Sequence, residues 1–162
     1  MKMQNLHEAM LDMLKDTYDA EHQITKALPK MVEAAKNSEL KKAFETHLRQ
    51  TEEQIRMVER IFETLGEKPS RKKCDGMAGL IKEGEHVIEE GGDPDVVDAA
   101  LIAAAQKVEH YEISAYGTLR TWANTMDHRD VALLFDQLNR QEEETDRLLT
   151  RIAESRVNQK AE

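Results

Sequence analysis

The sequence predicts an all-α protein built as an antiparallel bundle of four long helices. Apolar residues recur every three or four positions along four long stretches, which is the spacing of one helix face. Charged residues make up 34% of the chain and aromatic residues 4%, which favours charge-faced helices over a β-sandwich. Residues that break or cap helices separate the stretches. Because 162 residues is about the length of one domain, we expect a single domain over residues 1–162.

The first two predicted helices form a hairpin with a short turn. The first runs from about Met3 to Lys36, and the second begins at a Ser38 cap and ends at Gly66, a residue suited to a left-handed C-terminal position. Their apolar stripes are Leu6, Met10, Leu14, Leu28 and Val32 in the first helix, and Phe44, Leu48, Ile55, Val58, Phe62 and Leu65 in the second.

The third and fourth long helices follow a longer connection. Residues 67–75 form a loop, and a short amphipathic helix then runs to the turn at Gly91. Asp93 followed by Pro94 is a good cap and first turn for the third long helix, which should reach about Met126. The fourth begins after a turn at residues 127–129. Its apolar stripe is Val131, Leu134, Leu138, Leu149 and Ile152.

Two short turns and one long crossover that contains its own short helix indicate a specific connectivity. The ferritin-like class of bundles has one such crossover connection. The sequence therefore predicts a ferritin-like antiparallel four-helix bundle with the extra helix between long helices two and three. An up-and-down bundle or an extended helical hairpin with a purely structural role is the alternative.

An internal repeat relates the two helical hairpins. When the chain is shifted by 91 residues, RQTEEQIRMVERIFE at 49–63 aligns with RQEEETDRLLTRIAE at 140–154, with eight of fifteen positions identical. The same shift places Glu21 on Glu112 and Leu28 on Leu119. Charged helices match by chance rather easily, but the extension into the other two helices favours a duplicated helix pair.

Several polar side chains are predicted to point into the bundle. Glu21, Glu112 and Glu142 lie on the apolar stripes of their helices, and His47 follows Phe44 by one turn on the second helix. Glu109 is one turn before Glu112, and Asp146 lies at the edge of the fourth stripe. The candidate metal ligands are therefore Glu21, His47, Glu109, Glu112, Glu142 and Asp146.

Clustered interior carboxylates repel one another unless they bind protons or a cation. Oxygen ligands with an imidazole suit iron, manganese or zinc, and bridging carboxylates suit two metal ions. The bundle-core di-iron pattern also needs two Glu-x-x-His pairs, and neither the second nor the fourth helix has one. The fourth helix offers Glu142 or Glu143 with Asp146, and Glu142 is preferred because it faces inward. Each acid taken alone is at least as well explained by a salt bridge at a helix interface.

The remaining histidines, the tyrosines and the cysteine carry less information. His110 is expected at the surface or at a dimer contact. Tyr18, Tyr111 and Tyr116 are expected to fill the core, with a redox role near a metal as the less favoured alternative. Cys74, the single cysteine, lies in the crossover loop beside Lys72 and Lys73, which could lower its thiol pKa. We expect it to be incidental. One cysteine cannot form an internal disulfide, which suits a reducing compartment.

Four segments of the chain carry a family resemblance: DTYDAEHQITKALPKM (16–31), KKCDGMAGLIKEGEHVIEE (72–90), DAALIAAAQKVEHYEISAYGTL (98–119) and ETDRLLTRIAE (144–154). They resemble the YciF/YciE-like proteins, a bacterial ferritin-like family. This resemblance implies a cytoplasmic, dimeric helical bundle linked with stress responses, and it places the six candidate ligands at inward polar positions. The family looks like a relative of the rubrerythrins, although this chain lacks the rubredoxin cysteines.

Two functions remain open from the sequence. The first is a di-iron or di-manganese carboxylate site that reacts with oxygen or peroxide; the second is a non-catalytic stress protein that acts as a helical homodimer through its surface. A net charge of −9 disfavours nucleic acid and anionic membranes as partners. Ile102 and Ile113, on the far side of the third long helix, indicate a second buried surface, covered by a dimer partner or by the short connecting helix. An iron-storage cage is a weaker third possibility.

Overall fold

The computed structural model describes residues 2–162, and the elements it forms are all helical. The prediction of an all-α chain is confirmed. Short helical segments, Ala153–Val157 and α6 (Asn158–Ala161), follow the last long helix. The main helices are α1 (Leu6–Ala34), α2 (Ser38–Thr64), α3 (Asp75–Glu90), α4 (Pro94–Thr125) and α5 (Arg129–Ile152).

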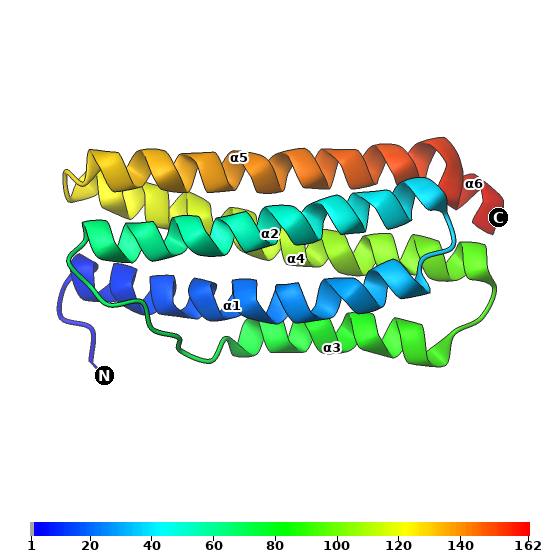
Figure 1. Cartoon of the computed structure of the whole chain (residues 1–162), viewed down its shortest axis with the longest axis horizontal. Helices are drawn as coiled ribbons and strands as arrows, with labels where there is room; N and C mark the ends of the chain where they lie inside the picture. Colours follow the sequence, from blue (N-terminus) through cyan, green and yellow to red (C-terminus); the bar gives the residue numbers. More distant parts are fainter. Residues whose placement is uncertain (1) are drawn as a thin grey trace.

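Four long helices lie side by side along the molecule (Figure 1). α1 packs mainly on α2, and α4 on α5, while α2 also contacts α5 and α1 contacts α4. Each of these pairs is antiparallel (Figure 1). α3 lies outside this group against α1 and α4, and it carries the chain from the end of α2 to the opposite end of the molecule, where α4 begins.

Side-chain caps set the helix starts. The Asp93 carboxylate accepts hydrogen bonds from the N–H groups of Asp95 and Val96, so the predicted start of α4 is confirmed. The predicted Ser38 cap is wrong by one residue, because the amide oxygen of Asn37 caps α2 and Ser38 is already helical. α1 likewise begins at Leu6 rather than near Met3, since Asn5 accepts the N–H of Glu8.

The core consists of two apolar clusters separated along the helices. One cluster gathers around Leu28, Phe44, Leu101 and Leu149, and the other around residues such as Phe62. Buried polar residues occupy the intervening stretch of each long helix. They are Glu21 of α1, His47, Thr51 and Gln54 of α2, Glu109 and Glu112 of α4, and Glu142 and Thr145 of α5.

The crossover helix α3 buries part of the surface that the sequence left open. Ile102 is 2% exposed and belongs to the same buried cluster as Met77 of α3. The far side of α4 is therefore covered at Ile102 by the chain itself, without a second copy. Ile113 is only half-buried. Cys74 is fully buried at the start of α3, where its sulfur accepts the N–H of Met77.

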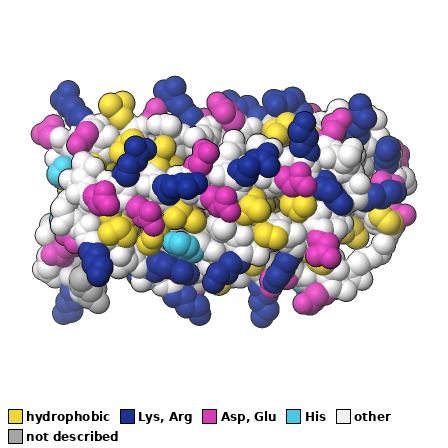
Figure 2. All heavy atoms as spheres, in the orientation of Figure 1, with side chains coloured by type: hydrophobic (Ala, Val, Ile, Leu, Met, Phe, Trp, Pro, Cys, Tyr) yellow, Lys and Arg dark blue, Asp and Glu magenta, His cyan; other side chains and the backbone are white. Residues whose placement is uncertain are grey.

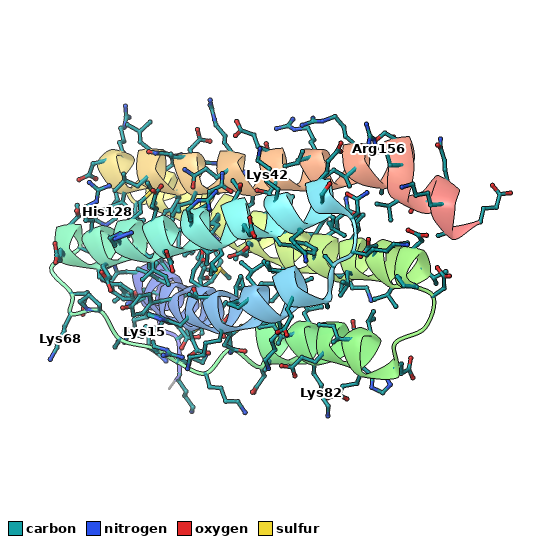
Figure 3. All side chains as sticks on the ribbon, turned by 45° about the vertical axis from the view of Figure 1, so that its right-hand side comes forward. Lys15, Lys42, Lys68, Lys82, His128 and Arg156 are labelled. Atoms are coloured by element: carbon teal, nitrogen blue, oxygen red, sulfur yellow. The ribbon has the colours of Figure 1, made fainter. Side chains whose placement is uncertain are left out.

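The outer surface is charged and mixed in sign. Figure 2 shows acidic and basic side chains interspersed over one face, with hydrophobic side chains between them. Lys42 of α2, Lys82 of α3 and Arg156 near the C-terminus all point away from the helices (Figure 3). Within residues 2–162, no helix combines the length and the apolarity that a membrane crossing requires.

Candidate metal centre

Four buried side chains converge in the polar middle of the helices. His47 of α2, Glu109 and Glu112 of α4, and Glu142 of α5 each offer one ligand atom, and these four atoms lie within 4.8 Å of one another. Three helices contribute because each presents its inward face at the same height. Glu109 and Glu112 are three residues apart, so one face of α4 carries both.

The carboxylates of α4 lack protein partners. Both oxygens of Glu109 and both oxygens of Glu112 are buried without a hydrogen bond. His47 Nδ1 lies 3.2 Å from Glu109 Oε1 and His47 Nε2 lies 3.8 Å from Glu142 Oε2, but neither contact has hydrogen-bond alignment. Buried polar atoms are nearly always paired, so such a group of unpaired atoms requires an explanation.

Two further side chains orient the centre. The Gln54 Nε2 group donates a hydrogen bond of 2.5 Å to Glu142 Oε1, which leaves Glu142 Oε2 free to face the cluster. The hydroxyl of Tyr116 donates to Glu21 Oε1. Tyr116 follows Glu112 by four residues on α4, so their shared helix face was the available sequence signal for this contact. The preferred prediction, that Tyr116 fills the core, agrees with its burial but does not include this hydroxyl contact.

Glu21 adjoins the group of four. It is fully buried on α1, and its Oε2 has no hydrogen-bond partner. Burial, reinforced by the nearby Glu142 charge, raises the pKa of Glu21 to about 8 in spite of the Tyr116 hydrogen bond. This electrostatic coupling places Glu21 beside the same interior charge, as its helical phase predicted.

Asp146 lies at the edge of the centre. Its Oδ1 is 3.2 Å from Nε2 of His110, whose side chain is 67% exposed. Asp146 is not in the group of four: its side chain is 20% exposed, and its buried Oδ1 faces His110 at the edge of the centre. His110 is exposed, as expected. Glu142, rather than Glu143, points inward; Glu143 accepts a hydrogen bond from Asn139, and its side chain is 41% exposed.

Burial and mutual repulsion set the protonation of the centre. Burial, followed by the Glu142 charge, raises the pKa of Glu109 and of Glu112 well above the usual range of a carboxyl group. Burial also lowers the pKa of His47, because the imidazolium form loses its hydration. A neutral imidazole is the form that binds metals, and carboxyl protons would be released on metal binding.

The residues present fit a metal ion by their chemistry. Carboxylate oxygens with one imidazole suit iron, manganese or zinc. In their ionised form the Glu109 and Glu112 carboxylates accept no hydrogen bond from the described part of the chain. The arrangement could therefore hold a metal ion, and its donor set does not specify which one.

Cys74 takes no part in this centre. Its sulfur lies 3.1 Å from the hydroxyl of Tyr111, which donates a hydrogen bond to Asp16. The less favoured alternative, in which Lys72 and Lys73 lower its thiol pKa, is not supported, because burial raises that pKa. Lys72 pairs instead with Asp12, and Lys73 with Asp75.

Comparisons with known proteins agree over nearly the whole chain. Residues 5–162 match the family model described as "Domain of unknown function (DUF892)". Protein YciF of Escherichia coli (strain K12) is 45% identical over 163 residues, covering 100% of this chain and 98% of that protein.

Solved structures give the same result. The crystal structure of the E. coli stress protein YciF has a TM-score of 0.93 and 44% identity, and covers 96% of this chain and 99% of that one. YcfI of Rhodopseudomonas palustris, for which a structural role has been proposed, has a TM-score of 0.90 and 42% identity over 92% of this chain and 95% of that one. A Xanthomonas campestris protein with 21% identity and a TM-score of 0.74, covering 93% of this chain and 92% of that one, shares the fold. The chain therefore belongs to the DUF892 family and is a homologue of the stress protein YciF.

Proposed function

We propose that this protein is a ferritin-like metal-binding protein whose helical core holds two iron ions, with manganese and zinc as the other candidates. The observation that carries the proposal is the unpaired state of Glu109 and Glu112, which bury four carboxylate oxygens without one hydrogen bond. Burial of such groups is costly unless protons or a cation compensate them. A cation satisfies all of them at once.

The ligand roles follow from position. His47, Glu109, Glu112 and Glu142 would hold one ion directly, and Glu21 would join them as a ligand to the second. Asp146 would contribute only after leaving His110. Gln54 and Tyr116 orient Glu142 and Glu21 through their hydrogen bonds.

Iron(II) would supply electrons to an oxidant. Two bound ions would together supply two electrons, which with two protons would convert one O₂ to H₂O₂ or one H₂O₂ to two waters. Metal binding would displace the carboxyl protons that burial favours on Glu21, Glu109 and Glu112 in the metal-free state, because burial raises the pKa of each group.

The ferritin-like class itself is part of the proposal. It is supported by the antiparallel long helices and by the crossover through α3. A single domain, a homodimeric assembly and a cytoplasmic location are proposed with it. The half-buried Ile113 on α4 is the surface feature that favours a dimer contact.

A non-catalytic stress or structural protein is the second candidate. Neither α2 nor α5 has the Glu-x-x-His pair typical of di-iron bundles. The E. coli relative is described as a stress protein, and a structural role has been proposed for the R. palustris one. In this alternative the interior acids are protonated and the surface carries the function.

Anaerobic titration with Fe(II) followed by exposure to oxidant separates the two. We expect stoichiometric binding and oxidation faster than in buffer. A Glu112→Gln variant should lose binding, while Glu143→Gln, which changes an outward carboxylate one residue from Glu142, should retain it. Absence of binding in the wild type would rule out the metal function and favour the non-catalytic one.

A further inference from the structure

An apolar pocket reaches the candidate metal centre from the side that α3 covers. Its volume is about 30 Å³, and its walls come from α1, α3 and α4, with His47 contributed by α2. Two residues of the centre, His47 and Glu109, line it together with Lys30 and Glu85. Since His47 and Glu109 are buried whereas Lys30 and Glu85 are exposed, the pocket runs from the surface between α1 and α3 to the centre.

Polar groups occur only at the two ends of this pocket. The Lys30–Glu85 ion pair, with Nζ and Oε1 2.6 Å apart, joins α1 to α3 at the outer end. Between the ends the lining is apolar and includes Leu80, Ile81 and Val108. A cavity that holds one water needs about 10–15 Å³, so this pocket has room for a small diatomic molecule.

The apolar lining of the pocket distinguishes dioxygen from hydrogen peroxide, the two oxidants that the proposed function leaves open. Hydrogen peroxide makes strong hydrogen bonds to water, and an apolar wall offers no replacement for them. Dioxygen is uncharged and makes no comparable hydrogen bonds. The pocket therefore favours the transit of dioxygen over that of peroxide.

We propose that this pocket is the route by which dioxygen reaches the His47 and Glu109 side of the metal centre, with α3 as its outer wall. The inference rests on the proposed function and narrows its oxidant to dioxygen. In the reaction each of two Fe(II) ions loses one electron, and O₂ takes up both electrons and two protons to form H₂O₂.

Gly84 of α3 and Ala104 of α4 provide opposite walls through which the pocket can be filled. A Cβ atom at Gly84 would lie 3.6 Å from the Cβ of Ala104, which is ordinary contact. A leucine at either position adds side-chain volume that the pocket must accommodate. Gly79, on the same helix, is exposed and would have no heavy atom within 4 Å of an added Cβ, so Gly79→Leu is the matched control.

The test has two readouts on the full-length protein. Dry apolar cavities bind xenon, so xenon NMR on the metal-free protein should show saturable binding in the wild type and in Gly79→Leu. The xenon affinity should be about tenfold or more weaker in Gly84→Leu and in Ala104→Leu. After Fe(II) loading, stopped-flow oxidation by O₂ should slow about tenfold in both filled variants, a barrier increase of about 1.4 kcal/mol. Oxidation by H₂O₂ should stay within about twofold.

The oxygen route, the preference for dioxygen and the proposed function are each contradicted by a different result. Absence of xenon binding in the wild type, or loss of xenon binding without slower oxidation by O₂, would overturn the route. Equal slowing with both oxidants would overturn the preference for dioxygen. If the wild type binds no iron, the proposed function fails and oxygen delivery fails with it, while xenon still reports on the pocket. Two filled variants from opposite walls, each checked by circular dichroism, keep the test decisive if one does not fold.

Discussion

Two buried carboxylates on the same helix have opposite surroundings. Asp98 of α4 is 1% exposed, and its two oxygens accept hydrogen bonds from the N–H groups of Lys36 at 2.8 Å and Asn37 at 2.7 Å. Glu109, three turns later, is 0% exposed and accepts no hydrogen bond at either oxygen. Asp98 ties α4 to the turn between α1 and α2, whereas the Glu109 carboxylate faces His47 and Glu142 without accepting a hydrogen bond from either.

Asp19 shows the same contrast on α1. It accepts hydrogen bonds from the Cys74 N–H at 2.8 Å, from Arg71 Nε at 2.9 Å and from Gln23. Burial alone would raise its pKa, but these hydrogen bonds, led by that of Cys74, lower it overall. Glu21, two residues later, has a raised pKa. Burial by itself therefore does not mark a functional carboxylate; a buried oxygen without a donor, such as Oε2 of Glu21, does.

The largest effect is expected from removing the unpaired carboxylates. Glu109→Gln combined with Glu112→Gln should weaken metal binding about 1,000-fold or more, since even residues that only support a ligand contribute about 10–100-fold. Equilibrium dialysis with Fe(II) or Mn(II) measures this. Asp98→Asn, which changes the paired carboxylate, should leave the affinity within about twofold. Equal losses in both variants would remove the distinction between the two kinds of carboxylate.

The second effect is a pH dependence of the free energy of unfolding of the metal-free protein. Glu21 has an ordinary pKa of 4.5 and a folded-state pKa of about 8, so the folded state holds its proton more tightly than the unfolded state. Its stabilising contribution is complete below pH 4.5 and is lost as the pH rises toward 8. Chemical denaturation in chelator should show a decrease on the order of 3 kcal/mol in the free energy of unfolding between pH 5 and 8. A free energy of unfolding that rises across this window would contradict the interior location of these acids.

A smaller loss is expected from removing the structural carboxylate. Asp98→Ala leaves the N–H groups of Lys36 and Asn37 without acceptors and should lower the free energy of unfolding by about 2–3 kcal/mol. Asp95→Ala, which removes only a surface ion pair with Lys36, should cost less than about 1 kcal/mol. Urea denaturation compares the two. Similar costs would mean that Asp98 does not tie the turn to α4.

The smallest expected effect is a stabilisation of the metal-free protein. Glu112→Gln should raise the free energy of unfolding of the metal-free protein at pH 7 by about 1 kcal/mol, because a neutral amide replaces a group that folding must protonate or bury as a charge. The same variant should lose metal-dependent stabilisation. Thermal denaturation in chelator and in added metal gives both values, and a destabilised metal-free variant would contradict this interpretation of Glu112.

The helices and the inward residues were predictable because helical phase is a local property. Spacing from Leu14 and Leu28 is enough to turn Glu21 inward, and the same argument holds for His47, Glu112 and Glu142. The loop before α3 was not predictable in this way. Its position depends on tertiary contacts, such as the Lys72 N–H donating to the carbonyl of Lys15, and these contacts bury Cys74.

Asp146 and Tyr116 show that helical phase predicts the direction of a side chain but not its partner on another helix. Both lie where the spacing allows an inward direction, but the partner across the interface decides what each side chain does. Asp146 turns toward His110, and the hydroxyl of Tyr116 reaches Glu21. Helix periodicity alone does not specify such contacts between helices.

Metal content per chain tests the central claim most directly. Elemental analysis should be done on protein purified without added metal and without an affinity tag, beside the Glu21→Ala, Glu112→Ala double variant. We expect about two iron or manganese ions per chain in the wild type, as in two-metal carboxylate sites, and none in the variant. A folded, thermally stable wild-type protein that contains no metal and binds none when it is offered would contradict the claim and favour a role carried by the surface.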